Sequence, residues 1–325
     1  MIQLFVFSMD KTTIARELHR PARRSFPTRM VTVKGLDDLY QADLVEMIPY
    51  SRQNKGYKYI LTIINCLSKY AHAIPLKNKS ADEVVKALRP IFEQHPMKNL
   101  HTDDGKEWFN SKFSQLVQQY GINHYSTFSD KKASIVERFN RTLKHLMWIK
   151  FTERGTYRWT DILNSLVKEY NGRVHRTIGM RPADVKKKEH ERLLLSRLGK
   201  QRHKYQHSLI DNRFYPGAHQ KIEPGDKVRI SKYKMTFDKG YLPNWTNELF
   251  TVTRVRPTVP VTYELEDYQG QPVQGGFYAE EIVRTKVPTV FEIAKVIKRK
   301  GDKLLVRWKG YDRSHDSWID KSDLV

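Results

Sequence analysis

The sequence has a single cysteine, Cys66, among its 325 residues. A disulfide needs two thiols, so no disulfide framework is possible, and such a chain is typical of a reducing compartment. Cys66 lies inside the apolar run of residues 59–67, which predicts a thiol buried in a core.

Long hydrophobic runs are also missing. No stretch approaches the roughly 18 uncharged apolar residues that a membrane-spanning helix needs. The apolar opening, residues 1–7, has no basic leader and is followed by Asp10 and Lys11, so it does not match a signal peptide. We therefore expect no membrane partner and a nuclear or cytoplasmic location.

Negative charge is scarce relative to positive charge. Lys and Arg total 58 against 36 Asp and Glu, which gives a net charge of +22. An excess of this size favours a polyanionic partner, and nucleic acid is the leading candidate; a solvated basic surface is the alternative. The length of 325 residues exceeds one ordinary core and predicts two or three domains.

The few acidic residues include three that stand at distinctive places. Residues 101–108, H-T-D-D-G-K-E-W, predict a strand that ends at Asp103, then a glycine turn and a helix. Asp43 lies in an alternating strand pattern over residues 39–47. Because neighbouring strand residues point to opposite faces, only one of Asp103 and Asp104 can share a face with a metal, and Asp104 is the competing candidate.

A third carboxylate, Glu137, lies near the start of a predicted helix over residues 133–150. An apolar stripe at helical spacing is expected to face the core: Ile135, Phe139, Leu143 and Leu146. The opposite face is expected to carry Glu137, Asn140, Arg141 and Lys144. That face could hold a metal ligand beside basic groups, or it could be an ordinary solvated face.

Residues 36–185 alternate between strand-like and helix-like segments, which predicts an α/β domain. Strands are expected at 57–67, 70–76 and, on a sheet edge, 122–128. Helices are expected after a capping box at residues 80–83, with Pro90 kinking or shortening the first, and then at 107–120, 133–150 and 159–171.

The flanking regions differ from this domain. Residues 11–30 are basic and punctuated by proline, and they predict an arm without regular structure unless it docks on something. Residues 186–207 predict a basic helix that is either a solvated connector or a nuclear-import or DNA-contacting segment. From residue 222 onward, short strands separated by turns predict a small five-stranded barrel.

Two motifs together, T-D-x-G-x-E at residues 102–107 and E-R-x-N-R-T-L-K at 137–144, resemble the catalytic core of retroviral-type integrases and their relatives in transposable elements. The resemblance implies a ribonuclease-H-like α/β core, a mixed sheet flanked by helices. It implies that Asp43, Asp103 and Glu137 are catalytic and hold two Mg²⁺ or Mn²⁺ ions, with Asp43 bridging the ions and T-D-x-G selecting Asp103 over Asp104. It assigns DNA contacts to Asn140, Arg141 and Lys144. Oxygen ligands suit Mg²⁺, and two such ions suit phosphodiester chemistry.

The C-terminal segment carries W-K-G-Y at residues 308–311 and a second tryptophan at 318, and it resembles a chromodomain. That resemblance implies a methyl-lysine cage formed by Phe291, Trp308 and Tyr311, and a methylated histone H3 tail as partner. The sequence ends at Val325, where the C-terminal helix of that family is expected to begin. The barrel resembles the SH3-like DNA-binding domain that follows integrase cores, and the single cysteine excludes their His-His-Cys-Cys zinc module within this sequence.

We therefore predict five segments: a basic N-terminal arm (1–33), the catalytic core (34–185), a basic linker (186–221), an SH3-like barrel (222–287) and a chromodomain lacking its C-terminal helix (288–325). Residues 237–241 and the Tyr170-Asn171 pair make the set most similar to integrases of Maverick or Polinton transposons, with chromodomain-bearing retrotransposon integrases second. The expected activity is end processing and strand transfer of element DNA into target double-stranded DNA, by a homo-oligomer in the nucleus. The alternatives are a domesticated chromatin-binding protein with an inactive core, and a general nuclease.

Overall fold

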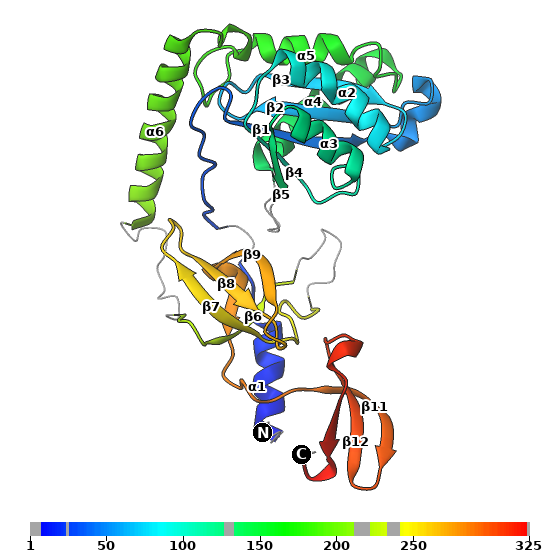
Figure 1. Cartoon of the computed structure of the whole chain (residues 1–325), viewed down its shortest axis with the longest axis vertical. Coiled ribbons are helices and arrows are strands. Elements are labelled where there is room, and N and C mark those ends of the chain that lie inside the picture. Colours follow the sequence, from blue (N-terminus) through cyan, green and yellow to red (C-terminus); the bar gives the residue numbers. More distant parts are fainter. Residues whose placement is uncertain (1–7, 24–25, 127–132, 211–221, 233–240, 324–325) are drawn as a thin grey trace. The chain divides into compact units, whose positions relative to one another are not determined.

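The chain folds into two units, one formed by residues 30–205 and one formed by residues 1–29 together with 206–325. The computed structural model describes residues 8–23, 26–126, 133–210, 222–232 and 241–323. Figure 1 labels the helices and strands of both units.

The unit of residues 30–205 is built on one mixed sheet. Its strands are β1 (Leu39–Glu46), β2 (Tyr59–Asn65), β3 (Ala71–Leu76), β4 (Asn99–Thr102) and β5 (Asn123–Ser126), in the order β3-β2-β1-β4-β5. β1 pairs antiparallel with β2 and parallel with β4, and β5 extends the parallel side as the edge strand. The predicted mixed α/β core is confirmed.

Helices cover both faces of this sheet (Figure 1). They are α2 (Ala81–Gln94), α3 (Ser111–Gln119), α4 (Ser134–Arg154) and α5 (Leu163–Gly172), and α6 (Lys188–Ile210) follows them. Leu61 and Ile63 of β2 pack with α2 and α3, whereas Ile60 and Ile64 pack with α4 and α5. This alternation follows from the two-residue period of a strand, and it leaves every residue of β2 buried.

Two sequence signals at α2, the capping box and Pro90, agree only in part with the structure. Ser80 caps the helix by accepting a hydrogen bond from the Glu83 N–H at 3.4 Å, but the Glu83 carboxylate accepts from Lys77 and Asn78 instead of returning to Ser80. Pro90 was expected to kink or shorten α2, yet the helix continues to Gln94. Burial of Ile91 and Phe92, beyond the proline, offsets the hydrogen bond that proline cannot donate.

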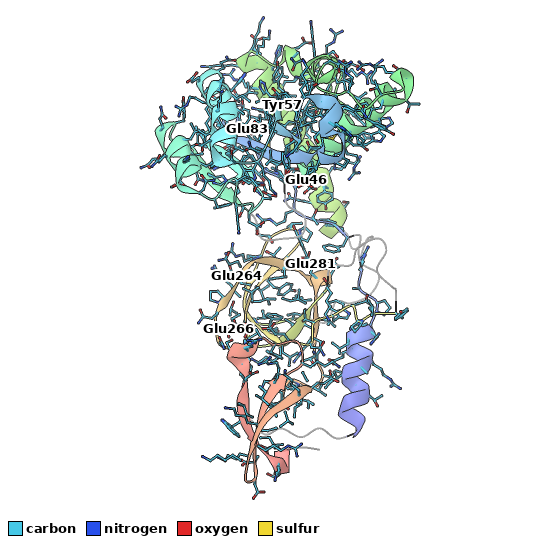
Figure 2. The ribbon with its side chains drawn as sticks, turned by 90° about the vertical axis from the view of Figure 1, so that its right-hand side faces the viewer. Glu46, Tyr57, Glu83, Glu264, Glu266 and Glu281 are labelled. Carbon is cyan, nitrogen blue, oxygen red and sulfur yellow. The ribbon has the colours of Figure 1, made fainter. Side chains whose placement is uncertain are left out.

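The other unit contains two sheets. Strands β6 (Lys227–Ile230), β7 (Phe250–Arg256), β8 (Thr262–Glu266), β9 (Pro272–Tyr278) and β10 (Ile282–Arg284) form an antiparallel sheet in the order β10-β6-β7-β8-β9. Leu265 lies between Glu264 and Glu266, which Figure 2 labels, and it is buried with Val228 and Val252. Strands β11 (Ile293–Lys300), β12 (Lys303–Trp308) and β13 (Ser317–Asp320) form a second sheet. Residues 237–240 of the 237–241 motif lie outside the described residues.

The segment of residues 11–30 was expected to be irregular unless it docks, and its first part belongs to helix α1 (Ser8–His19). Among its residues whose burial is described, Ile14 and Leu18 are the apolar side chains buried against Trp245, Val283 and Val290, and two such residues are too few for a periodic signal. The expectation that this segment needs a docking surface in order to fold is therefore met within its own unit.

A buried ion pair joins α1 to the five-stranded sheet. Glu17 lies 3.2 Å from the Arg229 Nε, and the side chains of the two residues are only 10% and 2% exposed. The Glu17 carboxylate also accepts from the Thr285 hydroxyl at 2.8 Å and from the Lys286 N–H at 2.6 Å. Arg229 donates further bonds to backbone carbonyls, so both buried charges are fully engaged.

We expect Glu17→Ala to destabilise this unit by about 3–5 kcal/mol, because it leaves the Arg229 guanidinium buried without its counter-charge. Hydrogen exchange measured by mass spectrometry should show faster exchange in α1, β6 and β10. The exposed pair of Asp302 and Lys321 provides the control, and Asp302→Ala should cost less than about 1 kcal/mol. Exchange unchanged in Glu17→Ala would contradict the role given to this pair.

Candidate active site

The three predicted carboxylates come from three adjoining elements of the 30–205 unit. Asp43 lies on β1, Asp103 directly follows β4, and Glu137 lies in the first turn of α4. β1 and β4 are parallel neighbours, and the pairing of Gln41 with His101 places Asp43 and Asp103 at matching points along them. α4 packs on β1 and β2, which carries Glu137 to the same region.

The surroundings of Asp43 disfavour its charged form. Burial raises the pKa of Asp43, and the negative charge of Asp103 raises it further. The Leu44 N–H, which donates to the Asp43 carboxylate at 2.8 Å, and the Asn140 amide, at 2.7 Å, act in the opposite direction, as does the charge of Lys144. The balance leaves the Asp43 pKa above its ordinary value.

Glu137 takes part in the same electrostatic cluster. Burial raises the pKa of Glu137, the charge of Asp43 raises it again, and the charge of Arg141 lowers it. Asp43 therefore interacts with both other carboxylates. A cation placed among the three would relieve repulsion that the side chains alone do not offset.

The choice between Asp103 and Asp104 has a structural counterpart. Asp103 is half-buried, and its carboxylate accepts the Gly105 N–H at 3.2 Å, which fixes its direction. Asp104 is exposed. Since Asp103 is the one that raises the pKa of Asp43, the geometry favours Asp103 as the partner of Asp43.

One expectation about α4 is corrected. Asn140 was placed on the polar face with the DNA contacts, but it is buried and donates its amide to Asp43. Val136 is fully buried and Ile135 only partly, so the buried face is rotated from the predicted stripe toward Asn140. Arg141 and Lys144 are exposed as expected, and their assignment to DNA stays a prediction.

The donor chemistry of this cluster fits a hard divalent cation. All three candidate ligands offer carboxylate oxygen, which Mg²⁺ and Mn²⁺ prefer. The Asn140 Oδ1 beside Asp43 is buried without a hydrogen-bond partner in the structure. Over the described residues, however, no three His, Cys, Asp or Glu side chains lie close enough to form a finished metal site. The three carboxylates are thus neighbours, but in this structure they do not form one set of metal ligands.

Gln41 is a residue that the sequence did not single out. Its side chain is buried beside Asp43, and its Oε1 accepts the N–H groups of Ile135 and Val136 at 2.9 and 3.1 Å. Strand periodicity could have pointed to Gln41, because a residue two positions before Asp43 on a strand has its side chain on the same face. Its partners on α4 could not be deduced from the sequence.

A second candidate site lies in the other unit. Phe291, Trp308 and Tyr311, predicted as a cage, do come together: the Phe291 ring centroid lies 5.9 Å from that of Trp308 and 6.1 Å from that of Tyr311. They line a cavity of about 560 Å³. Tyr268, in the turn after β8, adds a further wall with its ring 5.7 Å from Phe291, which the sequence did not reveal.

Tyr311 also connects the two sheets of this unit. Its hydroxyl oxygen accepts the Leu249 N–H at 3.0 Å, and burial raises the pKa of Tyr311 to about 12. The Asn247 amide donates to the Glu292 carboxylate at 3.0 Å nearby. The aromatic cavity is therefore anchored to the five-stranded sheet.

Part of the 30–205 unit is similar to a known protein family. Residues 36–129 match the model of the integrase core domain. A transposon-derived protein of Caenorhabditis elegans is 32% identical over 207 residues, covering 63% of this chain and 65% of that protein. The retrovirus-related Pol polyprotein from transposon 412 of Drosophila melanogaster is 36% identical over 121 residues, 36% of this chain and 10% of that polyprotein. The match thus spans less than two thirds of either relative.

Among solved structures, the simian T-cell lymphotropic virus intasome in complex with the PP2A regulatory subunit B56 gamma is similar in fold. It aligns with a TM-score of 0.54 and 14% identity, covering 88% of this chain and 89% of that chain. A sequence identity this low supports similarity of fold and nothing further.

Within the described residues, none of the helices combines the length and apolar character that crossing a membrane requires.

We expect Mn²⁺ titrated calorimetrically into the full chain to bind in the wild type and to lose most of that binding in Asp43→Asn. The variant should remain close to the wild type in thermal stability, because the neutral amide removes the repulsion from Asp103 but can accept only one of the two hydrogen bonds from Leu44 and Asn140. Asp104→Asn, an equal change of charge at an exposed neighbour, should keep the binding. Equal Mn²⁺ binding by Asp43→Asn and the wild type would contradict the assignment.

Proposed function

From an integrase core domain with transposon-derived and retroviral Pol relatives, we propose that this protein is the integrase of a transposable element, which processes element ends and joins them to target DNA. The observation that carries the proposal is the placement of Asp43, Asp103 and Glu137 on or next to the adjoining elements β1, β4 and α4 of that core, where the charge of Asp103 acts on Asp43 and the charge of Asp43 acts on Glu137. Each acid alone would be an ordinary carboxylate. Their mutual interaction in this fold supports a polynucleotidyl transferase.

Asp43, Asp103 and Glu137 would hold two divalent ions, Mg²⁺ or Mn²⁺. Such ions activate the attacking oxygen of water or of a DNA end and stabilise the leaving oxygen. The Asn140 amide orients Asp43 from within the helix interface, and the Gly105 N–H fixes Asp103. These bonds hold the carboxylates at defined positions on β1 and after β4.

DNA would approach the exposed side of α4. Arg141 and Lys144 lie one and two turns beyond Glu137, and their side chains are exposed. Their charges also influence Glu137 and Asp43, respectively, so a phosphate bound by them would lie near the carboxylates. The net charge of +22 supports a double-stranded DNA partner for the whole chain.

The five-stranded sheet of the other unit would be an SH3-like barrel that contributes to DNA binding. The support is its set of short antiparallel strands around a core that includes Val228, Val252 and Leu265. The three-stranded sheet that follows would be a chromodomain. We place the protein in the nucleus as a homo-oligomer, within the Maverick or Polinton type, with a retrotransposon integrase as the alternative.

The aromatic cavity would bind a methylated lysine of histone H3 and bias where the element inserts. A trimethylammonium group is permanently charged and weakly hydrated, so it gains from several ring faces at once. Phe291, Trp308 and Tyr311 supply three rings, and Tyr268 supplies a fourth at the rim. A domesticated chromatin-binding protein would keep this cavity while losing DNA joining, which makes activity the deciding measurement.

We expect Asp103→Asn to abolish cleavage and joining of a labelled element-end duplex in Mg²⁺ or Mn²⁺ while duplex affinity changes little. Asp104→Asn should remain active, because its side chain is exposed beside the cluster. An inactive Asp104→Asn with an active Asp103→Asn would reverse the assignment. A wild-type protein that binds DNA and joins none would favour the domesticated alternative.

Lys144→Glu should weaken engagement of element ends more than binding to random duplex. It should also lower the slope of log affinity against log salt by about 1, the value for one phosphate contact. Lys150→Glu, farther along the same helix, makes the same charge change and serves as control. Equal losses on both DNA substrates would reduce Lys144 to a phosphate contact without a role in end recognition.

Trp308→Ala should reduce the preference of the full chain for a methylated over an unmethylated H3 peptide in fluorescence anisotropy. Each cation–π contact contributes about 0.5–2 kcal/mol, so one lost ring should weaken the methylated complex by roughly 2- to 30-fold. Tyr268→Ala should cause a smaller loss, since Tyr268 is 43% exposed. Wild-type affinities that do not differ between the two peptides would sink the methyl-lysine proposal.

A further inference from the structure

The N-terminus of α4 lacks a capping side chain of its own. The residue at the cap is Ala133, with φ 23° and ψ 42°, and its methyl group can accept no hydrogen bond. The first backbone N–H groups of a helix have no partner within the helix, and Ser, Thr, Asp or Asn commonly supplies one. Because Glu137 lies in this first turn, its placement depends on how the turn is held.

Gln41 supplies the missing cap from another element. Its Oε1 accepts the Ile135 N–H at 2.9 Å and the Val136 N–H at 3.1 Å, across 94 and 95 residues of sequence. Gln41 is 1% exposed, so water cannot replace these bonds without opening the interface between β1 and α4. The cap is therefore a tertiary contact.

The other end of the same amide reaches β4. With Oε1 occupied by two donors, the Gln41 Nε2 faces the Nδ1 of His101 at 3.3 Å. An amide nitrogen can only donate, so the His101 Nδ1 accepts and the proton of the neutral ring sits on Nε2. His101 is itself buried and stacks on Tyr125, with 5.0 Å between ring centroids.

Each element that Gln41 contacts carries one of the three carboxylates. Gln41 lies two residues before Asp43, and His101 lies two residues before Asp103, in register across the two parallel strands. Val136 directly precedes Glu137. We propose that Gln41 is a positioning residue whose single amide sets the placement of β1, β4 and α4, and thereby of the three carboxylates. The inference rests on the proposed function in one respect, that Asp43, Asp103 and Glu137 are the catalytic carboxylates.

A matched amide elsewhere in the same unit separates positioning from ordinary stabilisation. Asn54 is 0% exposed, and its Oδ1 accepts the N–H groups of Trp159 and Thr160 at 2.7 and 3.2 Å. Its Nδ2 donates to the carbonyls of Tyr50 and Tyr157. Asn54 thus makes the same kind of clamp with no contact to the carboxylate-bearing residues.

The test compares Gln41→Leu, Gln41→Glu and Asn54→Leu in the full chain. In Gln41→Leu, hydrogen exchange at the amides of Ile135 and Val136 should rise by roughly tenfold or more, because two buried donors lose their acceptor. Mn²⁺ affinity and DNA joining should each fall by about 10- to 100-fold, as for residues that orient metal ligands. Gln41→Glu keeps both acceptor bonds, and it should retain the exchange protection and recover part of the Mn²⁺ affinity.

Asn54→Leu should lose comparable thermal stability while Mn²⁺ affinity and exchange at residues 135–136 stay at wild-type values. If Gln41→Leu does not fold, Gln41→Glu carries the test through its Mn²⁺ affinity relative to its thermal stability. Gln41 variants that bind Mn²⁺ as well as Asn54→Leu does, at matched stability, would overturn the positioning role. Failure of the proposed function looks different: the wild type would join no DNA, while the exchange and Mn²⁺ measurements would still decide the role of Gln41.

Discussion

Repulsion between carboxylates that are partly removed from water is the constraint on which the candidate active site depends. Burial and the charge of Asp103 both raise the pKa of Asp43, and burial and the charge of Asp43 raise that of Glu137. Side chains left free to move would separate. Asp43 and Asp103 are held by specific donors, the N–H groups of Leu44 and Gly105 and the amide of Asn140. Holding these like charges close together lowers the stability of the folded state, and such a cost is typical of functional sites.

The side chains of β1 divide between an apolar face and a face that carries the polar cluster. Tyr40 and Ala42 pack toward α2 and α3, whereas Val45 packs toward α4. Gln41 and Asp43 share the α4 side, so polar groups enter an otherwise apolar interface. A buried polar group there is costly unless it is hydrogen-bonded, and Gln41 and Asn140 obtain their bonds from each other's elements. These bonds leave the Asn140 Oδ1 without a partner, but they fix where α4 sits on the sheet.

The other unit uses polar contacts to join small elements that have little core of their own. The three-stranded sheet buries only Leu304, Val306 and Ile319, with aromatic rings packed around them. The Tyr311 hydroxyl accepting the Leu249 N–H, and the Asn247 amide donating to Glu292, attach it to the larger sheet. Within the same unit, Glu17 joins α1 to Arg229 of β6 through an ion pair. An aromatic cavity at such a junction takes its walls from both sheets.

Much of this organisation was legible in the sequence, because it rests on local patterns. Alternation over residues 39–47, the Ser80 cap and the long apolar stripe near Glu137 placed β1, α2 and α4. The two motifs located Asp103 after β4 and Glu137 on α4, whereas Asp43 was found in the alternating pattern of β1. The sequence missed α1, whose two apolar residues give no periodic signal, and it put Asn140 on the wrong face because an amide reads as a surface residue by composition. It could not reveal that Gln41 caps a helix 94 residues away or that Tyr268 joins the aromatic cavity. Helix and strand periods depend on residues that are close in sequence, so they can be recognised from the sequence. The partner of a buried polar group is decided only when distant elements pack and water is excluded.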